Sequence, residues 1–454
     1  MADQIAQNDL ERKLGLFPLT NIVLANMIGA GIFTTSGLLM TDLYNPVLML
    51  VLWFAGGIIA ICGALSYGEL GASIPEAGGE YIFLSKLYSP GAGFLSGWVS
   101  FIVGFSAAIA ASAIGFSEYL VRAFPGIIEW TSIRGFLDPD ILKKLISVII
   151  ILLFTFIHLR GIEFGAKVQN YLSLLKLGLI AVLILAGFLF GSGDIGNLRK
   201  GMEFSFDFGG WKTIGLSLMW IMFAYSGWNA STYIGSEIRD PQKNLPRSLL
   251  LGTGIVMFLY LLLNLFFVYA VTPDNMKDVI SIGGLAAGNA FGKPAETVIS
   301  VLISFALFSS LSAFIILGPR VYYSMAKDGH FFKFVSEVHP SFKVPSKAIM
   351  LQAGISMIMI LSGTFDQILT YMGFSLGIFP LLAVAGVFKL RRSGRSRIKM
   401  PGYPVVQIIY LLTGLTILTL SYFERPVEST IAVVTVLTGI PVFIYFRKKY
   451  NAFE

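Results

Sequence analysis

Apolar runs of about 20 residues recur from one end of the chain to the other, and no other feature constrains the fold as strongly. A run of that length can cross a bilayer as a helix. The composition agrees with this interpretation, because 55% of the residues are hydrophobic and only 13% are charged, against roughly 25% in soluble domains. We therefore predict an all-α polytopic membrane protein.

The apolar runs divide the chain into about twelve expected transmembrane helices. Several of them exceed the length that crossing requires, which predicts tilted or broken helices. The expected spans cover residues 15–41, 46–70, 90–123, 144–160, 166–191, 211–235, 246–271, 294–326, 346–363, 366–390, 402–423 and 427–446.

Lys and Arg are unevenly distributed among the connecting segments. If the N-terminus is placed inside the cell, the inner segments carry roughly twice as many of these residues as the outer segments. The bias predicts a multi-pass protein of the plasma membrane with both termini in the cytoplasm. It also accounts for the net charge of +7, which therefore does not indicate nucleic-acid binding.

Glycine interrupts two of the expected spans. The first break lies in Asn26-Met27-Ile28-Gly29-Ala30-Gly31-Ile32-Phe33 and the second in Phe223-Ala224-Tyr225-Ser226-Gly227-Trp228-Asn229. Glycine weakens a helix and lets its backbone unwind. Unwound backbone at bilayer depth is tolerated only where it is buried in protein or lines a cavity. A pair of breaks at corresponding positions of two halves is the best sequence indication of a transporter's substrate site.

The two breaks also predict how the chain is organised. Each break lies in the first of five successive spans, and two groups with an odd number of spans must be oppositely oriented. We expect one transmembrane transporter domain over residues 1–454, with inverted repeats at 15–191 and 211–390 and two additional helices at 402–446.

The first break offers backbone groups of both polarities. If the helix resumes near Ile32, the amides of Ala30, Gly31 and Ile32 face the cavity at a positive helix end, which suits a carboxylate. The carbonyls near Met27, together with those of the second break, suit an ammonium group. A zwitterionic α-amino acid fits between the breaks. The alternative is that the glycines serve only close helix packing.

Lys176 lies in the middle of an apolar span, where a charge is costly and indicates function by default. Its ammonium group can replace a bound metal ion, bonding to carbonyls of the first break and to a hydroxyl of the eighth span. It can also exchange a proton, or extend to the membrane surface. The candidate hydroxyl groups are those of Ser309, Ser310 and Ser312.

Acidic residues and histidines are expected to lie away from the two helix breaks. No Asp or Glu lies mid-span near either break, so a strongly cationic substrate is disfavoured. Glu69 and Glu118 lie toward span ends, where anchoring of loops is expected. His158, His330 and His339 are expected in loops, so no metal or proton-relay cluster is predicted. The chain also lacks a phosphate-binding motif, and we expect neither a cofactor nor an enzyme.

These segments together resemble the amino acid–polyamine–organocation superfamily, and within it the L-type amino acid transporters. The match covers nearly the whole chain and includes the loop motif Ile74-Pro75-Glu76-Ala77-Gly78-Gly79-Glu80-Tyr81. The resemblance implies a LeuT-like inverted-repeat fold and sodium-independent transport by exchange. It implies Phe223 as a gate and Lys176, with Ser310, at the sodium position of sodium-coupled relatives. The implied substrate-binding residues are Met27, Ile28, Gly29, Ala30, Gly31, Phe223, Ser226 and Gly227.

One departure from the family concerns its partner subunit. Animal members that join a glycoprotein use a cysteine in the loop after the third span, but residues 124–143 contain none, and the one cysteine is Cys62 in the second span. We expect no disulfide-linked heavy subunit, a monomer or weak dimer, and a bacterial inner membrane.

The leading prediction is an antiporter of small to medium neutral L-amino acids that works by alternating access. A proton-coupled importer with Lys176 as proton carrier is the alternative within transport. A sensor that binds amino acids without moving them is the third possibility.

Overall fold

The computed structural model describes residues 12, 14–76, 78–127, 138–160, 162–202, 204–339, 342 and 344–451, with the backbone alone at 162–170, 172, 316, 320, 324, 450 and 451. Ala77 of the loop motif lies outside the described residues, as does part of the cysteine-free loop over 124–143. Among the described residues every regular element is a helix, and one isolated bridge joins Leu14 to Ile238.

The described part of the first half contains three long unbroken helices and two long helices that are interrupted. Its elements are α1 (Leu16–Met27), α2 (Ala30–Leu43), α3 (Pro46–Ser73), α4 (Glu80–Leu87), α5 (Pro90–Val99), the π-helix η1 (Ser100–Gly104), α6 (Phe105–Ala123), α8 (Pro139–Leu159), α9 (Ile162–Phe190) and η2 (Ile195–Arg199).

The second half opens on another interrupted helix and ends on two long hairpin-connected helices. Its elements are α10 (Phe208–Ala224), η3 (Ala230–Tyr233), η4 (Gly235–Glu237), α11 (Pro241–Ala270), α12 (Pro273–Met276), α13 (Ile282–Phe291), α14 (Lys293–Lys327), η5 (Lys333–Ser336), α15 (Ser346–Ser362), α16 (Phe365–Arg392), α17 (Val405–Glu424) and α18 (Pro426–Asn451).

Ten helical segments among the described residues are long and apolar enough to cross a membrane. The apolar helix α15 has 17 residues, and α10 has 17 residues before its break. These twelve segments match the expected spans, and the prediction of an all-α polytopic membrane protein is confirmed. The division into two inverted repeats stays a prediction.

Local sequence explains where several helices begin. Proline occupies the first turn of α3, α5 and α8, where its missing amide costs no hydrogen bond. The side chain of Asn45 accepts a hydrogen bond from the Leu48 amide at 2.9 Å, and Ser89 caps α5 in the same way.

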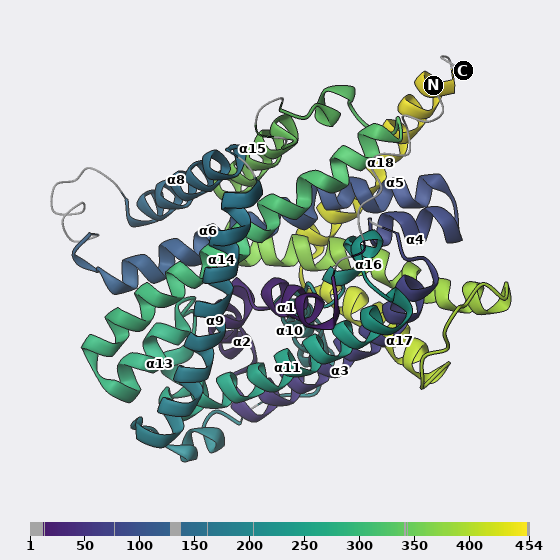
Figure 1. The fold of residues 1–454 in the computed structure, drawn as a ribbon. Helices are drawn as coiled ribbons and strands as arrows, with labels where there is room; N and C mark the ends of the chain where they lie inside the picture. Colours follow the sequence, from purple (N-terminus) through teal and green to yellow (C-terminus); the bar gives the residue numbers. More distant parts are fainter. Residues whose placement is uncertain are drawn as a thin grey trace.

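The broken helices lie at the centre of the molecule. Figure 1 shows α1, α2 and α10 surrounded by the other helices. The central part of the segment Leu16–Leu43 is 78% buried, against 22% for α17 and 28% for the segment Pro426–Lys449. Protein therefore surrounds the breaks, and the last two helices present apolar side chains outward, as lipid contact requires.

Polar contacts define the two ends of the bundle. At one end, which we call the α4 side, Arg391 binds Glu69 through two hydrogen bonds of 2.6 Å, and the Tyr81 hydroxyl donates to Asp328 at 2.7 Å. At the opposite side, Arg122 pairs with Glu296 at 3.0 Å. These contacts anchor loops to helix ends, so the loop-anchoring role expected for Glu69 is confirmed.

Candidate functional site

The first break is short and lies at Ile28 and Gly29. The inner helix α1 ends at Met27, as predicted, and Ile28 and Gly29 are extended. The outer helix α2 begins at Ala30, two residues before the expected Ile32, because Gly29 takes the extended conformation of an N-cap. The first amides of α2 have no acceptor within their own helix.

The second break is longer and places Gly227 in the left-handed region. Helix α10 ends at Ala224, the chain turns through Gly227 with φ of 95°, and η3 begins at Ala230. A side chain is strained at such a φ, whereas glycine adopts it freely.

The two breaks pack directly against each other. A Cβ atom added to Gly31 would lie 2.5 Å from Cα of Ala224, and one added to Gly227 would lie 2.8 Å from the backbone carbon of Asn26. Close packing, the alternative kept open for the glycines, is thus one of their roles. It also brings the free end of each broken helix beside the other break.

Tyr260 of α11 connects the two breaks. Its hydroxyl oxygen lies 2.6 Å from the carbonyl oxygen of Met27 and 3.1 Å from that of Ala224. The carbonyl of Phe223 accepts the Ser226 amide at 2.9 Å. Two of the carbonyls predicted to bind an ammonium group therefore already have one partner, and each retains a second lone pair.

Lys176 reaches the first break from α9. Its side chain is 1% exposed, and Nζ lies 3.0 Å from the carbonyl oxygen of Ala25 and 3.4 Å from the hydroxyl of Ser310. It also donates to the carbonyl of Ile28, which accepts from Ser310 at 3.3 Å as well. The side chain points into the protein, so it does not extend to the membrane surface.

The other two candidate hydroxyl groups have different neighbours. The oxygen of Ser309 lies 3.2 Å from that of Ser173, and Ser312 lies 3.0 Å from Nε2 of His158. His158 is in α8 and is 4% exposed, so its expected place in a loop was wrong. His158 lies in the last turn of α8, which ends at Leu159. No group of acids, histidines and cysteine that could hold a metal ion occurs among the described residues.

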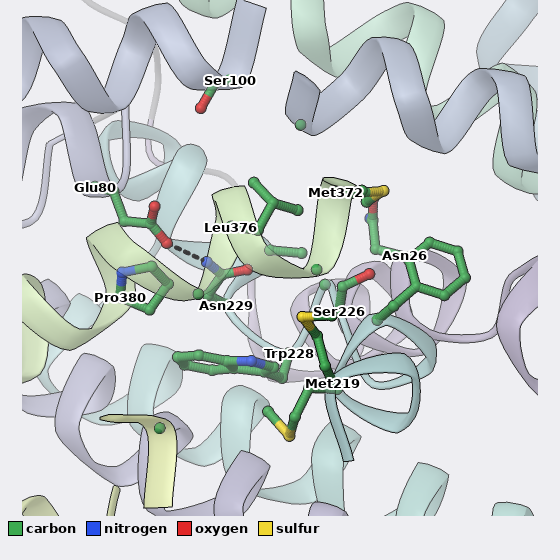
Figure 2. Close-up of a pocket in the computed structure, with 18 of the residues that line it drawn as sticks. Asn26, Glu80, Ser100, Met219, Ser226, Trp228, Asn229, Met372, Leu376 and Pro380 are labelled. Carbon is green, nitrogen blue, oxygen red and sulfur yellow. Dashed lines mark hydrogen bonds between the residues drawn. The ribbon is translucent and has the colours of Figure 1, made fainter. Parts of the chain in front are cut away.

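A cavity extends from the second break toward the α4 side. Of the predicted substrate-binding residues, Phe223, Ser226 and Gly227 lie on its wall, whereas the segment 27–31 does not. Asn26, beside the first break, faces it (Figure 2). The carbonyl end of the second break is thus open to the cavity, and the first break contributes through one neighbouring side chain.

Apolar side chains cover most of the cavity wall. Met219 and Met372 lie near Ser226 in Figure 2, and Trp228 lies below Asn229. The Trp228 ring packs edge-on against that of Tyr67, with centroids 4.7 Å apart. Methionine is flexible and polarisable, so such a wall can fit apolar side chains of different shapes.

Glu80 corrects the expectation that the cavity lacks charge. It is the first residue of α4, a short helix between two spans, and the chain folds back so that its carboxylate lies on the cavity wall (Figure 2). Oε1 accepts hydrogen bonds of 2.8 Å from the Tyr67 hydroxyl and from Nδ2 of Asn229. Sequence reasoning missed it because an acid in a loop was not expected to reach the depth of a helix break.

Burial and hydrogen bonding act on Glu80 in opposite directions. Burial raises the pKa of Glu80 to about 7, while the hydrogen bonds from Tyr67 and Asn229 lower it less strongly. Glu80 is the only carboxylic acid among the described residues of the cavity wall, which include no lysine, arginine, histidine or cysteine.

Two other parts of the cavity wall were missed. Ser100 and Gly104 belong to the π-helix η1, which interrupts the third span. Such π-turns occur frequently at functional sites, but residue pattern alone does not reveal them. Asn229 belongs to the second break but was not predicted as a cavity residue. A side-chain amide at membrane depth is a sequence feature that could have indicated it.

Comparisons with known proteins identify the family of the chain. A family profile described as "Amino acid permease" matches residues 14–445. The chain belongs to the amino acid permease family.

Curated relatives match the chain over nearly its whole length. The serine/threonine exchanger SteT of Bacillus subtilis is 28% identical, with 97% of this chain and 98% of the relative covered. The b(0,+)-type amino acid transporter 1 of mouse is 27% identical over 98% of this chain and 90% of the relative. The mouse large neutral amino acids transporter small subunit 2 is also 27% identical, over 98% and 83%.

These matches confirm the resemblance to the amino acid–polyamine–organocation superfamily and its L-type branch. The chain is a membrane-embedded amino acid transporter and not an enzyme.

Proposed function

We propose that this permease is a sodium-independent exchanger of small to medium neutral L-amino acids. The two breaks, which pack against each other in this arrangement, separate so that the substrate lies between them. Its carboxylate is then at the amides of Ala30 and Gly31 and its ammonium group at the carbonyls of Met27, Phe223 and Ser226. The Phe223 ring, on the cavity wall, serves as the gate. Alternating access then exposes this site to each side of the membrane in turn.

The position of Lys176 is the observation that carries sodium independence. Its ammonium group binds two carbonyls at the end of α1 and lies near the Ser310 hydroxyl of α14. These are the oxygen ligands that a small cation would need. The Lys176 ammonium group occupies this position and already supplies a positive charge to these oxygens, so a sodium ion is not needed there.

The character of the cavity wall supports a neutral substrate. Methionine, leucine and aromatic side chains dominate it, and Glu80 lies at its α4 end with two donors on one oxygen. Serine and threonine exchange by the Bacillus relative supports the smaller end of the range.

The Lys and Arg bias supports placing the α4 side in the cytoplasm, and we propose a bacterial inner membrane because the loop over 124–143 lacks a cysteine for a partner subunit. The segments on this side include the loop of residues 393–404, which carries Arg395, Arg397 and Lys399. We propose that the transporter works without a disulfide-linked subunit, because Cys62 is buried in α3.

Uptake into proteoliposomes tests the proposal. Labelled serine, alanine and leucine are offered in the absence of sodium to vesicles that are empty or preloaded with unlabelled amino acid. Exchange predicts uptake into preloaded vesicles alone. Preference for arginine or glutamate over these substrates would contradict the substrate class.

Two other outcomes would replace the proposal. Uptake into empty vesicles that rises with an inward proton gradient would identify a proton-coupled importer. Binding of amino acids without uptake in either vesicle type would identify a sensor.

A further inference from the structure

Helix α4 connects two groups of helices across the end of the cavity. Its first two residues hydrogen-bond in different directions. Glu80 binds Tyr67 of α3 and Asn229 of the unwound segment after α10, each at 2.8 Å. Tyr81 binds Asp328, just after α14, at 2.7 Å. Any opening of the cavity at this end must separate α4 from one of these groups.

Glu80 is buried without a basic partner. Its side chain is 7% exposed, and it forms no ion pair with any described residue. Both of its hydrogen bonds go to Oε1, so Oε2 accepts none from the described residues. In Figure 2 this second oxygen points away from Asn229. A carboxylate in this position lacks the solvation that water would give it.

The groups that face Glu80 are all uncharged near neutral pH. They are Tyr67 on α3, Tyr233 on η3 and Tyr410 on α17, together with the Asn229 amide. The neighbouring charges are engaged elsewhere. Lys86 pairs with Glu76, and the α16 residue Lys389 lies over the Tyr88 ring at the other end of α4; helix α5 contains no charged residue.

We propose that Glu80 is a positioning residue that controls opening of the cavity on the α4 side. As a neutral acid it keeps α4 bonded to α3 and to the unwound segment of α10. As a carboxylate it favours a hydrated, open arrangement. The inference rests on the proposed function in one respect: it assumes that the substrate leaves the cavity at the α4 side in one of the two transport states.

The direction of the pH effect follows from linkage. Burial in the closed arrangement raises the pKa of Glu80 to about 7 from the ordinary 4.5, and hydration on opening restores the lower value. The closed arrangement therefore binds the proton more tightly, so acidification stabilises it, and opening becomes easier as pH rises from about 4.5 to about 7 and then levels off.

Thiol labelling measures this opening without requiring transport. In a Cys62→Ser background the chain has no other cysteine, and Met372→Cys places one thiol on the cavity wall. A membrane-impermeant maleimide is supplied on the α4 side of sealed vesicles, and labelling rates are compared with and without Glu80→Gln. The ratio of the two rates cancels the pH dependence of the thiol itself.

Glutamine is neutral at all pH values and keeps an oxygen for Tyr67 and Asn229. We expect labelling at least tenfold faster with Glu80 than with glutamine at about pH 7.5, and a ratio that falls toward one at about pH 4.5. The matched control Glu76→Gln, an exposed acid of the same loop, should follow the parent chain throughout. A ratio near one at every pH overturns the proposal.

A second variant keeps the carboxyl group. Tyr67→Phe removes a hydrogen bond that lowers the pKa of Glu80, so the midpoint of the pH dependence should move to higher pH. An unchanged midpoint would contradict the proposal even if the glutamine variant failed to fold. If labelling behaves as expected but no variant exchanges amino acids, the proposed function fails while the role of Glu80 stands.

Discussion

At the scale of the residue, the isolated position of Lys176 in an apolar span indicated a function, and the structure shows which oxygen atoms its ammonium group contacts. Its ammonium group joins α9 to the end of α1 and to α14 through three oxygen atoms. It lies behind the breaks and not on the cavity wall. This geometry favours a fixed cation over a group that meets solvent protons, whereas Glu80 on the wall is the better candidate for titration.

Replacement of Lys176 by methionine separates these two roles. Lys176→Met keeps the length of the side chain but removes the donor that Ala25, Ile28 and Ser310 share, and Ile28 then keeps only the Ser310 hydroxyl. This loss should lower stability by about 2 kcal/mol. We expect exchange to slow in proteoliposomes while its pH dependence persists. The control Lys200→Met, on an exposed lysine, should change neither. Exchange that persists but loses its pH dependence would instead support Lys176 as the proton carrier.

The glycines of the breaks make a second prediction at this scale. Gly31→Ala would drive a methyl group into Ala224, and overpacking of this kind costs about 1–3 kcal/mol. Gly227→Ala adds backbone strain because of its positive φ. Both should lower the thermal midpoint and amino acid binding.

Gly254→Ala is the matched control, because no atom lies within 4 Å of the position that its Cβ would occupy. A loss of stability at Gly254 equal to that at Gly31 would show that helix packing between the breaks is not the cause.

At the scale of the element, a buried ion pair fixes the end of α16 to α3. Glu69 is fully buried and accepts hydrogen bonds from Arg391, from the Ser396 hydroxyl at 2.8 Å and from the Met400 amide at 3.0 Å. The Arg391 guanidinium also lies 4.0 Å from the centre of the Tyr403 ring. One acid thus orders the whole connection between α16 and α17.

Breaking this pair should be costly because it leaves a buried charge. Arg391→Met is expected to reduce the free energy of unfolding by about 3 kcal/mol. The double variant Glu69→Met with Arg391→Met should recover part of the loss, since it removes both charges. Thermal unfolding in detergent measures both effects. A double variant less stable than the sum of the single changes would argue against the buried charge as the cause.

At the scale of the whole molecule, the contacts at the two ends predict which segments share a side of the membrane. In a Cys62→Ser background, Ser393→Cys on the α4 side should react with impermeant maleimide in the cytoplasm. Asp274→Cys, at the opposite side, should react from outside intact cells. Reaction of both thiols from one side would contradict the twelve-span topology, and exchange of the two patterns would reverse the proposed orientation.

The class of fold was predictable because lipid imposes a simple requirement. Every backbone group of a span must be bonded within its own helix, so apolar length alone identifies the spans. The breaks after α1 and α10 were predictable for a related reason, since glycine weakens a helix and lets its backbone take other conformations. The start of α2 differed by two residues because Gly29, the first glycine of the break, takes the extended N-cap conformation.

The sequence by itself determined that the chain spans the membrane as helices, that two helices break, and that a lysine is enclosed at mid-span. Each follows from local chemistry that one segment carries alone. Only the tertiary structure decided that Gly31 packs on Ala224, that His158 is buried in a helix, and that Glu80 lies on the cavity wall. Those features are contacts between segments far apart in the chain, and such contacts depend on how whole helices pack.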